Sequence, residues 1–156
     1  KSLGIVFGVI LLMFLVIFRS IKVAIIGLIL NILTASSVLG LLGILSIPLD
    51  IMTITVAAIS VGMAVDNTIH YLYRYKAEIS NGVAPSDAIL KSHTTIGRAI
   101  LYTALTISIG FLIFSFSNFS PTVLFGTFTS LAIFTSLVAT LILLPLLLQS
   151  FKAFDS

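Results

Sequence analysis

The sequence predicts an all-α membrane protein, a bundle of about five transmembrane helices. Hydrophobic residues make up 59% of its 156 residues and charged residues only 8%, whereas soluble domains carry about 25% charged residues. The apolar residues fall into long runs, and a membrane-spanning helix needs about 20 of them. Because so few charges cannot cover a water-facing surface, we expect the bilayer to surround the chain. The basic residues are scattered, which argues against a nucleic-acid partner.

Five stretches are long and apolar enough to be counted as spans: 3–18, 23–45, 51–73, 99–116 and 123–148. The first is short, but Arg19 at its end can reach the membrane interface by snorkelling. Pro145 near the end of the fifth predicts a kink or the exit of the helix, because proline cannot donate a backbone hydrogen bond. The connections are too short to hold another domain, so residues 1–156 are read as a single transmembrane domain.

Basic residues occupy alternate connections. Arg19 and Lys22 follow the first span, and four more lysines and arginines lie in the segment 74–98, whereas the connections 46–50 and 117–121 contain none. The positive-inside rule assigns the basic connections to the cytoplasm. The sequence therefore predicts an N-terminus outside and a C-terminus in the cytoplasm.

The segment 74–98 is expected to be a cytoplasmic loop. Asn81-Gly82 is typical of a turn, and Pro85 is typical of the first turn of a helix. The residues after Pro85 could form a short amphipathic helix or a solvated linker, and His93 is interpreted as a solvated loop residue. Asp50 and Arg98 are interpreted as boundary markers that flank spans.

Asp66 is the acid that the sequence places deep in a span, and we expect it to be buried. It lies about 22 Å along the third span, at about 1.5 Å per residue. A carboxylate at such depth costs at least about 2.5–3.5 kcal/mol on insertion scales. It therefore needs a partner, a wet cavity or a changed protonation state.

A polar stripe runs through this residue. Gly62, Asp66 and His70 are spaced four residues apart and share one helix face, with Asn67 and Arg74 beside or on it. These residues could conduct a proton toward the basic side. Alternatively, Asp66 serves only as an assembly contact, and His70 simply reaches water at the interface.

The segment 60–71, SVGMAVDNTIHY, followed by Arg74-Tyr75, resembles the fourth or tenth membrane helix of the resistance-nodulation-division (RND) superfamily. It is most similar to the branch of the mycobacterial (MMPL) lipid exporters, hopanoid transporters and Patched. The segments 18–20, 97–111, 117–126 and 144–145 resemble further helices of that branch, in the same order. Many relatives carry Asp-Tyr where this chain has Asp66-Asn67.

The resemblance implies one half, the C-terminal half, of a pseudo-twofold RND-type membrane domain in a bacterial or archaeal inner membrane. It implies an exporter of hydrophobic or lipid-like molecules driven by the proton-motive force. Asp66 would bind the proton, Asn67 and His70 would support it, and Thr103 and Thr106 would be hydrogen-bond neighbours. Partners would be the bilayer, the substrate, the other half on the same or another chain, and further copies of this chain if it forms a homo-oligomer.

Other functions fit the same fold. A sterol- or lipid-sensing domain, or an assembly domain, would need no titrating acid and would not pump. An enzyme is not expected, since no catalytic constellation is present. No cofactor or metal is expected either, protons serving as the coupling ion.

Overall fold

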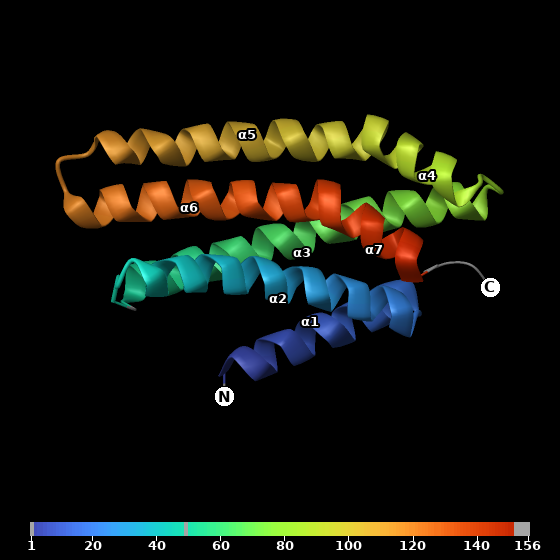
Figure 1. Cartoon of the computed structure of the whole chain (residues 1–156), viewed down its shortest axis with the longest axis horizontal. Coiled ribbons are helices and arrows are strands. Elements are labelled where there is room, and N and C mark those ends of the chain that lie inside the picture. The colour runs from blue at the N-terminus through green and yellow to red at the C-terminus, as the bar shows by residue number, and fades with distance from the viewer. Residues whose placement is uncertain (1, 49, 152–156) are drawn as a thin grey trace.

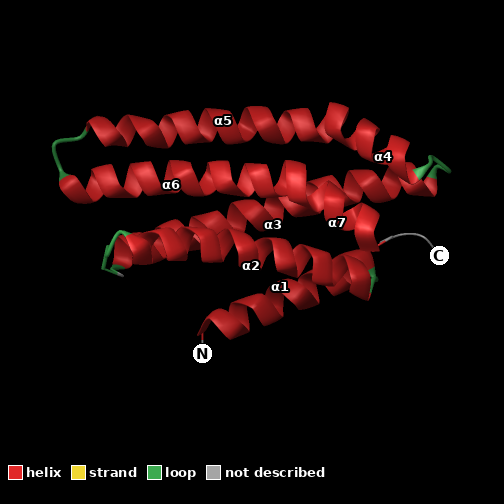
Figure 2. Cartoon of the chain, in the orientation of Figure 1, coloured by secondary structure: helices red, strands yellow, loops and turns green. Residues whose placement is uncertain are grey.

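The computed structural model describes residues 2–48 and 50–151, and within them it contains helices and no strand (Figure 2). Three helices come first: α1 (Ser2–Phe18), α2 (Ile21–Ile44) and α3 (Ile51–Ser80). Two long composite helices come next. The first is made of α4 (Pro85–Ser92), the π-helical η1 (His93–Gly97), α5 (Arg98–Leu112) and the 3₁₀-helical η2 (Ile113–Phe116). The second is made of α6 (Ser120–Val138), the π-helical η3 (Ala139–Leu143) and α7 (Leu144–Phe151).

Among the residues that the structure describes, four helical stretches are long and apolar enough to cross a membrane: Ile21–Ile44, Ile51–Ser80, Pro85–Phe116 and Ser120–Phe151. The helix α1 is apolar but shorter. Its 17 residues give about 26 Å of helix at 1.5 Å per residue, against a hydrocarbon core about 30 Å thick. The expected all-α bundle is thus confirmed, with four full-length spans and a shorter fifth helix.

The segment expected to be a loop is mostly helical. α3 continues past position 73 to Ser80, and α4 begins at Pro85, so that only a four-residue turn separates them. Gly82 makes this turn with φ of 79°, a left-handed conformation that glycine adopts without strain. The structure also decides between the amphipathic helix and the solvated linker, because the residues from Pro85 onward form a helix that buries Ala88 and Ser92 against the bundle.

The helices pack in a layered order along the chain. α1 packs on α2, α2 on α3, and α6 contacts both α3 and α5, while α4 lies against the end of α3. In Figure 1 the α1–α2 and α3–α4 connections lie at one end of the bundle, on the right. The α2–α3 and α5–α6 connections lie at the opposite end. The connections rich in lysine and arginine therefore share one end of the molecule.

Proline explains the bend in the last helix. Pro145 has no N–H to donate to the carbonyl of Leu141, four residues earlier, and the π-helical turn η3 ends two residues before Pro145. Figure 1 shows α7 turning away from the line of α6 at this point. The kink expected from Pro145 is present, and it leaves the Leu141 carbonyl open to a partner outside its own helix.

Candidate functional site

Asp66 lies on the outward face of α3 and not between the helices. Its side chain is 64% exposed, and that of His70 is 59% exposed. His70 Nε2 stands 3.3 Å from Asp66 Oδ1, one helical turn away. The expectation that Asp66 is buried within the described bundle is therefore wrong. The expected partnership with His70, by contrast, is present as an i,i+4 pair.

Asn67 points the other way. It is 4% exposed, and its Nδ2 has no hydrogen-bond partner among the described residues. Successive residues on a helix are turned by about 100° from each other, so neighbours in the sequence face different sides. Asp66 and Asn67 are therefore divided between the surface and the interior of the bundle.

The two threonines proposed as neighbours of Asp66 lie on a different helix. Thr103 and Thr106 are exposed on α5, which packs on α6. The Thr106 hydroxyl donates to the carbonyl of Tyr102, in its own helix, at 2.8 Å. Within the residues that the structure describes, no hydrogen bond joins either threonine to Asp66.

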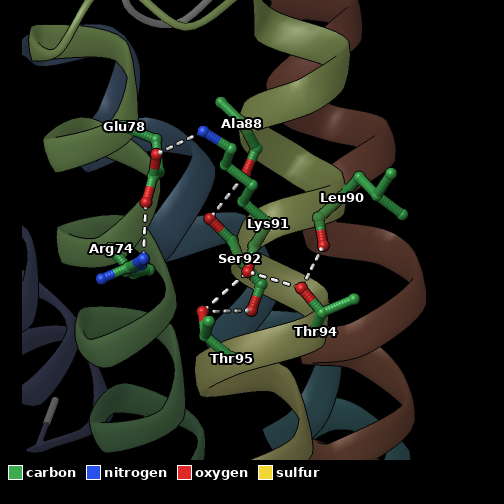
Figure 3. A network of polar contacts seen from close by, with 8 residues as sticks. All are labelled: Arg74, Glu78, Ala88, Leu90, Lys91, Ser92, Thr94 and Thr95. Atoms are coloured by element: carbon green, nitrogen blue, oxygen red, sulfur yellow. Dashed lines mark hydrogen bonds and ion pairs between the residues drawn. The ribbon is translucent and has the colours of Figure 1, made fainter.

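Glu78 is the buried acid among the described residues, and the sequence does not predict its role. Its side chain is 9% exposed, and its Oε1 lies 2.6 Å from Arg74 Nη2. Its Oε2 lies 3.6 Å from Lys91 Nζ on α4 (Figure 3). Arg74, which follows His70 at the same four-residue spacing, is thus engaged with Glu78. The signal that could have found this pair is its four-residue spacing, which has meaning only if the segment is helical.

His93 is the second residue whose place the sequence does not predict. The expectation of a solvated loop residue is wrong, because His93 is a partly buried helical residue that joins α3, η1 and η3. Tyr71 Oη on α3 lies 2.6 Å from His93 Nδ1, and His93 Nε2 lies 2.9 Å from the carbonyl oxygen of Leu141 in η3. The rings of Tyr71 and His93 meet edge to face, with centroids 5.5 Å apart.

Asp50 is a boundary residue, as expected, with a defined task. It caps α3: its Oδ1 accepts from the backbone N–H of Thr53 at 2.8 Å, and Thr53 Oγ1 accepts from the N–H of Asp50 at 2.8 Å. This reciprocal arrangement is a capping box. The hydrogen bond from the Thr53 backbone holds the pKa of the Asp50 carboxyl below its usual range.

The outward side of α3 carries three exposed small residues before Asp66. Thr55, Ala58 and Gly62 precede Asp66 on this face. A Cβ atom added to Gly62 would meet nothing within 4 Å. This part of the face could therefore receive another helix at close range, with the Asp66–His70 pair at its end.

Known proteins resemble this chain in sequence. Residues 2–154 match the model of the MMPL family. A putative membrane protein of Methanocaldococcus jannaschii is 31% identical over 109 residues, which are 70% of this chain and 28% of that protein. The probable transport protein MmpL11 of Mycobacterium leprae is 26% identical over 146 residues, 92% of this chain and 14% of that protein. No solved structure matches the chain.

A third relative is also a mycobacterial protein. The heme uptake protein MmpL11 of Mycobacterium tuberculosis is 30% identical over 102 residues, 64% of this chain and 11% of that protein. The chain thus spans less than a third of the length of each of these relatives. Its apolar helices are long enough to span a membrane, and the match over nearly the whole chain shows that the chain belongs to the MMPL family.

Proposed function

We propose that this chain is the membrane part of an exporter of hydrophobic or lipid-like molecules, driven by the proton-motive force. The observation that carries the proposal is the Asp66–His70 pair, which lies about 22 Å along a spanning helix and faces outward. Ionisable residues within spans are costly, and they mark ion and proton paths by default. Asp66 binds the translocated proton, and His70 is its partner.

The Asp66–His70 pair can bind or release one proton at a time. With one shared proton, the pair carries no net charge, either as carboxylate and imidazolium or as carboxylic acid and imidazole. Loss of that proton leaves one negative charge, and gain of another leaves one positive charge. Because an unpaired charge is costly in a medium of low dielectric constant, each change favours a different surrounding arrangement. Proton binding can therefore be coupled to movement of the helices.

The exposure of the pair implies a covering partner. Facing acyl chains, two ionisable side chains would have no further hydrogen-bond partner. A second helix bundle, the other half of the transporter on the same or a separate chain, would cover the face defined by Thr55, Ala58, Gly62 and Asp66. Transporters are commonly built from two such structural repeats, with the coupling site between them. Asn67 lies on the buried side of α3 and the two threonines lie on α5, so none of the three is placed at this contact.

We further infer that the end of the bundle that carries the basic connections faces the cytoplasm of a bacterial or archaeal cell, with the chain in the inner membrane. Arg19 and Lys91 are exposed there. This assignment is based on the positive-inside rule and places the N-terminal end of α1 on the outer side. His70 then lies on the cytoplasmic side of Asp66, as a proton path toward the basic end requires.

The test uses the full-length protein in liposomes with an imposed pH gradient. Asp66→Asn should abolish proton-coupled transport of a hydrophobic fluorescent probe, because the amide cannot titrate, while Asp66→Glu should retain part of it. Asp87→Asn is the matched control, since Asp87 is an exposed acid in the first turn of α4. Undiminished coupled transport in Asp66→Asn would sink the proposal.

A second candidate function rests on the same exposed face. A sterol- or lipid-sensing domain, or an assembly domain, would use the pair only as a contact. In that case Asp66→Asn would disrupt complex formation or ligand response, and no proton flux would accompany either. Because one relative is named a heme uptake protein, probe movement should be measured in both directions, with heme among the probes.

A further inference from the structure

We propose that His93 is a second proton-binding site, on the opposite side of α3 from Asp66, and that proton binding there opens the junction between α3, η1 and η3. The junction consists of Tyr71, His93 and Leu141, joined by contacts of 2.6 Å and 2.9 Å. It goes beyond the proposed transport role of Asp66 and can be tested without any transport measurement.

The partners of the imidazole fix its tautomer. The Leu141 carbonyl can only accept, so His93 Nε2 must carry a hydrogen and donate it. His93 Nδ1 then has a free lone pair and accepts from the Tyr71 hydroxyl. In this arrangement the neutral imidazole uses both nitrogens, and Tyr71, whose side chain is fully buried, has its hydroxyl satisfied.

The sequence supplies the acceptor for this arrangement. The N–H that would normally bond to the Leu141 carbonyl belongs to residue 145, which is proline and has no N–H. The carbonyl is therefore available to a side-chain donor from another element. His93 meets this need from η1, so that the π-helical turn of one composite helix is tied to the π-helical turn of the other.

A proton added at Nδ1 disrupts this network. The imidazolium has two N–H donors, and the one at Nδ1 would point at the hydroxyl hydrogen of Tyr71. To accept from it, the hydroxyl must rotate and find another acceptor for its own hydrogen inside the bundle. This step breaks no bond to carbon, and the imidazole of His93 takes up one proton from the solvent. The hydrogen bond from Tyr71 to the imidazole is lost, while Nε2 can still donate to Leu141.

The groups around His93 do not offset the new positive charge. η1 packs on α3, α4 and α5. Their titratable or charged residues along this end are Tyr71, Tyr73, Arg74, Tyr75, Lys76 and Glu78 of α3, Asp87 and Lys91 of α4, and Arg98 and Tyr102 of α5. The described part of η3 and α7 carries none. Glu78 is already engaged with Arg74 and Lys91, and Asp87 is exposed. A protonated His93 would therefore gain no carboxylate contact and would favour an opened, hydrated junction.

π-helical turns are suited to such a change. They are inserted into α-helices mostly as single turns, frequently at functional sites. Here two of them, η1 and η3, face each other across a single imidazole. Opening of this contact would free α4 and α7 to shift relative to α3, while the packing of α5 on α6 elsewhere in the bundle stays intact.

Hydrogen exchange of the purified full-length protein tests the proposal. Amide exchange in peptides covering 93–97 and 139–143 is measured from pH 8 to pH 5, at exposure times scaled for the chemical pH dependence of exchange. Wild type should exchange about tenfold faster at pH 5 than at pH 8, as expected for loss of one partly buried hydrogen bond. We call this increase the acid step. Peptides from 124–134 of α6 should show no such step.

Variants of His93 and of other residues show which group causes the faster exchange at acid pH. His93→Gln can still accept from Tyr71 and donate to Leu141, but it cannot be protonated, so its protection should be high and independent of pH. His93→Phe makes neither bond and should exchange fast at every pH. His70→Gln, which removes the exposed histidine, should keep the acid step, and so should Asp66→Asn.

The proposal is overturned if the acid step persists in His93→Gln, or if wild type shows none. Should His93→Gln not fold, Tyr71→Phe serves instead. It removes the competing hydroxyl, so the acid step should shrink or vanish, and an unchanged step would contradict the proposal. Because Asp66→Asn is expected to lose transport but keep the step, failure of the transport proposal and failure of this one give different results.

Discussion

Removal of the Glu78 carboxylate should detach α4 from α3. Glu78 is the buried member of a three-residue network with Arg74 and Lys91, and breaking a fully buried pair costs about 3–5 kcal/mol. Here the cationic side chains are 43% and 53% exposed, so water compensates part of the loss. We expect Glu78→Ala to lower the free energy of unfolding by about 2 kcal/mol, between the buried range and the roughly 0–1 kcal/mol of surface pairs.

Glu78→Gln removes the negative charge of the side chain but keeps its size and shape. The amide keeps the volume of the side chain and one oxygen acceptor, so we expect a loss of about 1 kcal/mol, since hydrogen bonds to charged groups are about twice as strong as neutral ones. Unfolding of the purified protein in detergent by increasing SDS measures both values, and hydrogen exchange in α4 should rise with them. Asp87→Ala is the control and should have little effect. Equal stability of Glu78→Ala and wild type would refute the structural role of this network.

Local geometry supports two further predictions. Gly126→Ala should destabilise the bundle by about 1–3 kcal/mol, the usual cost of overpacking, because the added Cβ would lie 2.5 Å from both Phe111 O and Phe114 Cβ. Gly62→Ala is the control and should leave SDS unfolding unchanged, since that position has open space. Equal effects of the two substitutions would contradict the packing described. Asp50→Asn should make the stability of the protein depend less on pH in the acid range. Because the pKa of Asp50 is lowered in the folded protein, its carboxylate contributes fully to stability above the ordinary carboxyl range, and this contribution is lost as pH falls through the lowered pKa. Thermal unfolding at pH values above and below the ordinary carboxyl range measures this, and an identical loss in wild type and variant would disprove it.

The class of fold and most helix positions can be predicted from the sequence, because long apolar runs broken by basic connections leave few alternatives in a membrane. The extent of α3 cannot. Charged residues after position 73 are typical of a loop that leaves the membrane, yet in the structure Arg74 and Glu78 pair one turn apart and the helix continues to Ser80. Charged residues mark where a span leaves the membrane, but the helix itself can continue past them.

The faces of the helices could not be predicted from the sequence. In a soluble helix, apolar residues mark the buried side. In α3, both the side that packs on α2 and α6 and the side that faces outward are apolar, so periodicity does not tell them apart. For this reason the sequence predicts a buried Asp66, whereas the structure exposes Asp66 and buries Asn67, the next residue. The role of His93 escapes prediction for a different reason, since its partners lie 22 residues before it and 48 residues after it.

The arrangement of α3 joins the two proposed proton sites physically. His70, which faces outward to Asp66, and Tyr71, which faces inward to His93, are consecutive residues of one helix. A helix that changes its outward contact can rotate or slide only if its inward contacts allow it, because packed interfaces shift between discrete arrangements and do not deform continuously. The Tyr71–His93 hydrogen bond is one such inward contact, and it lies at the same level as the Asp66–His70 pair. Proton binding at Asp66 alone would therefore act against this restraint, and a proton at His93 would remove it.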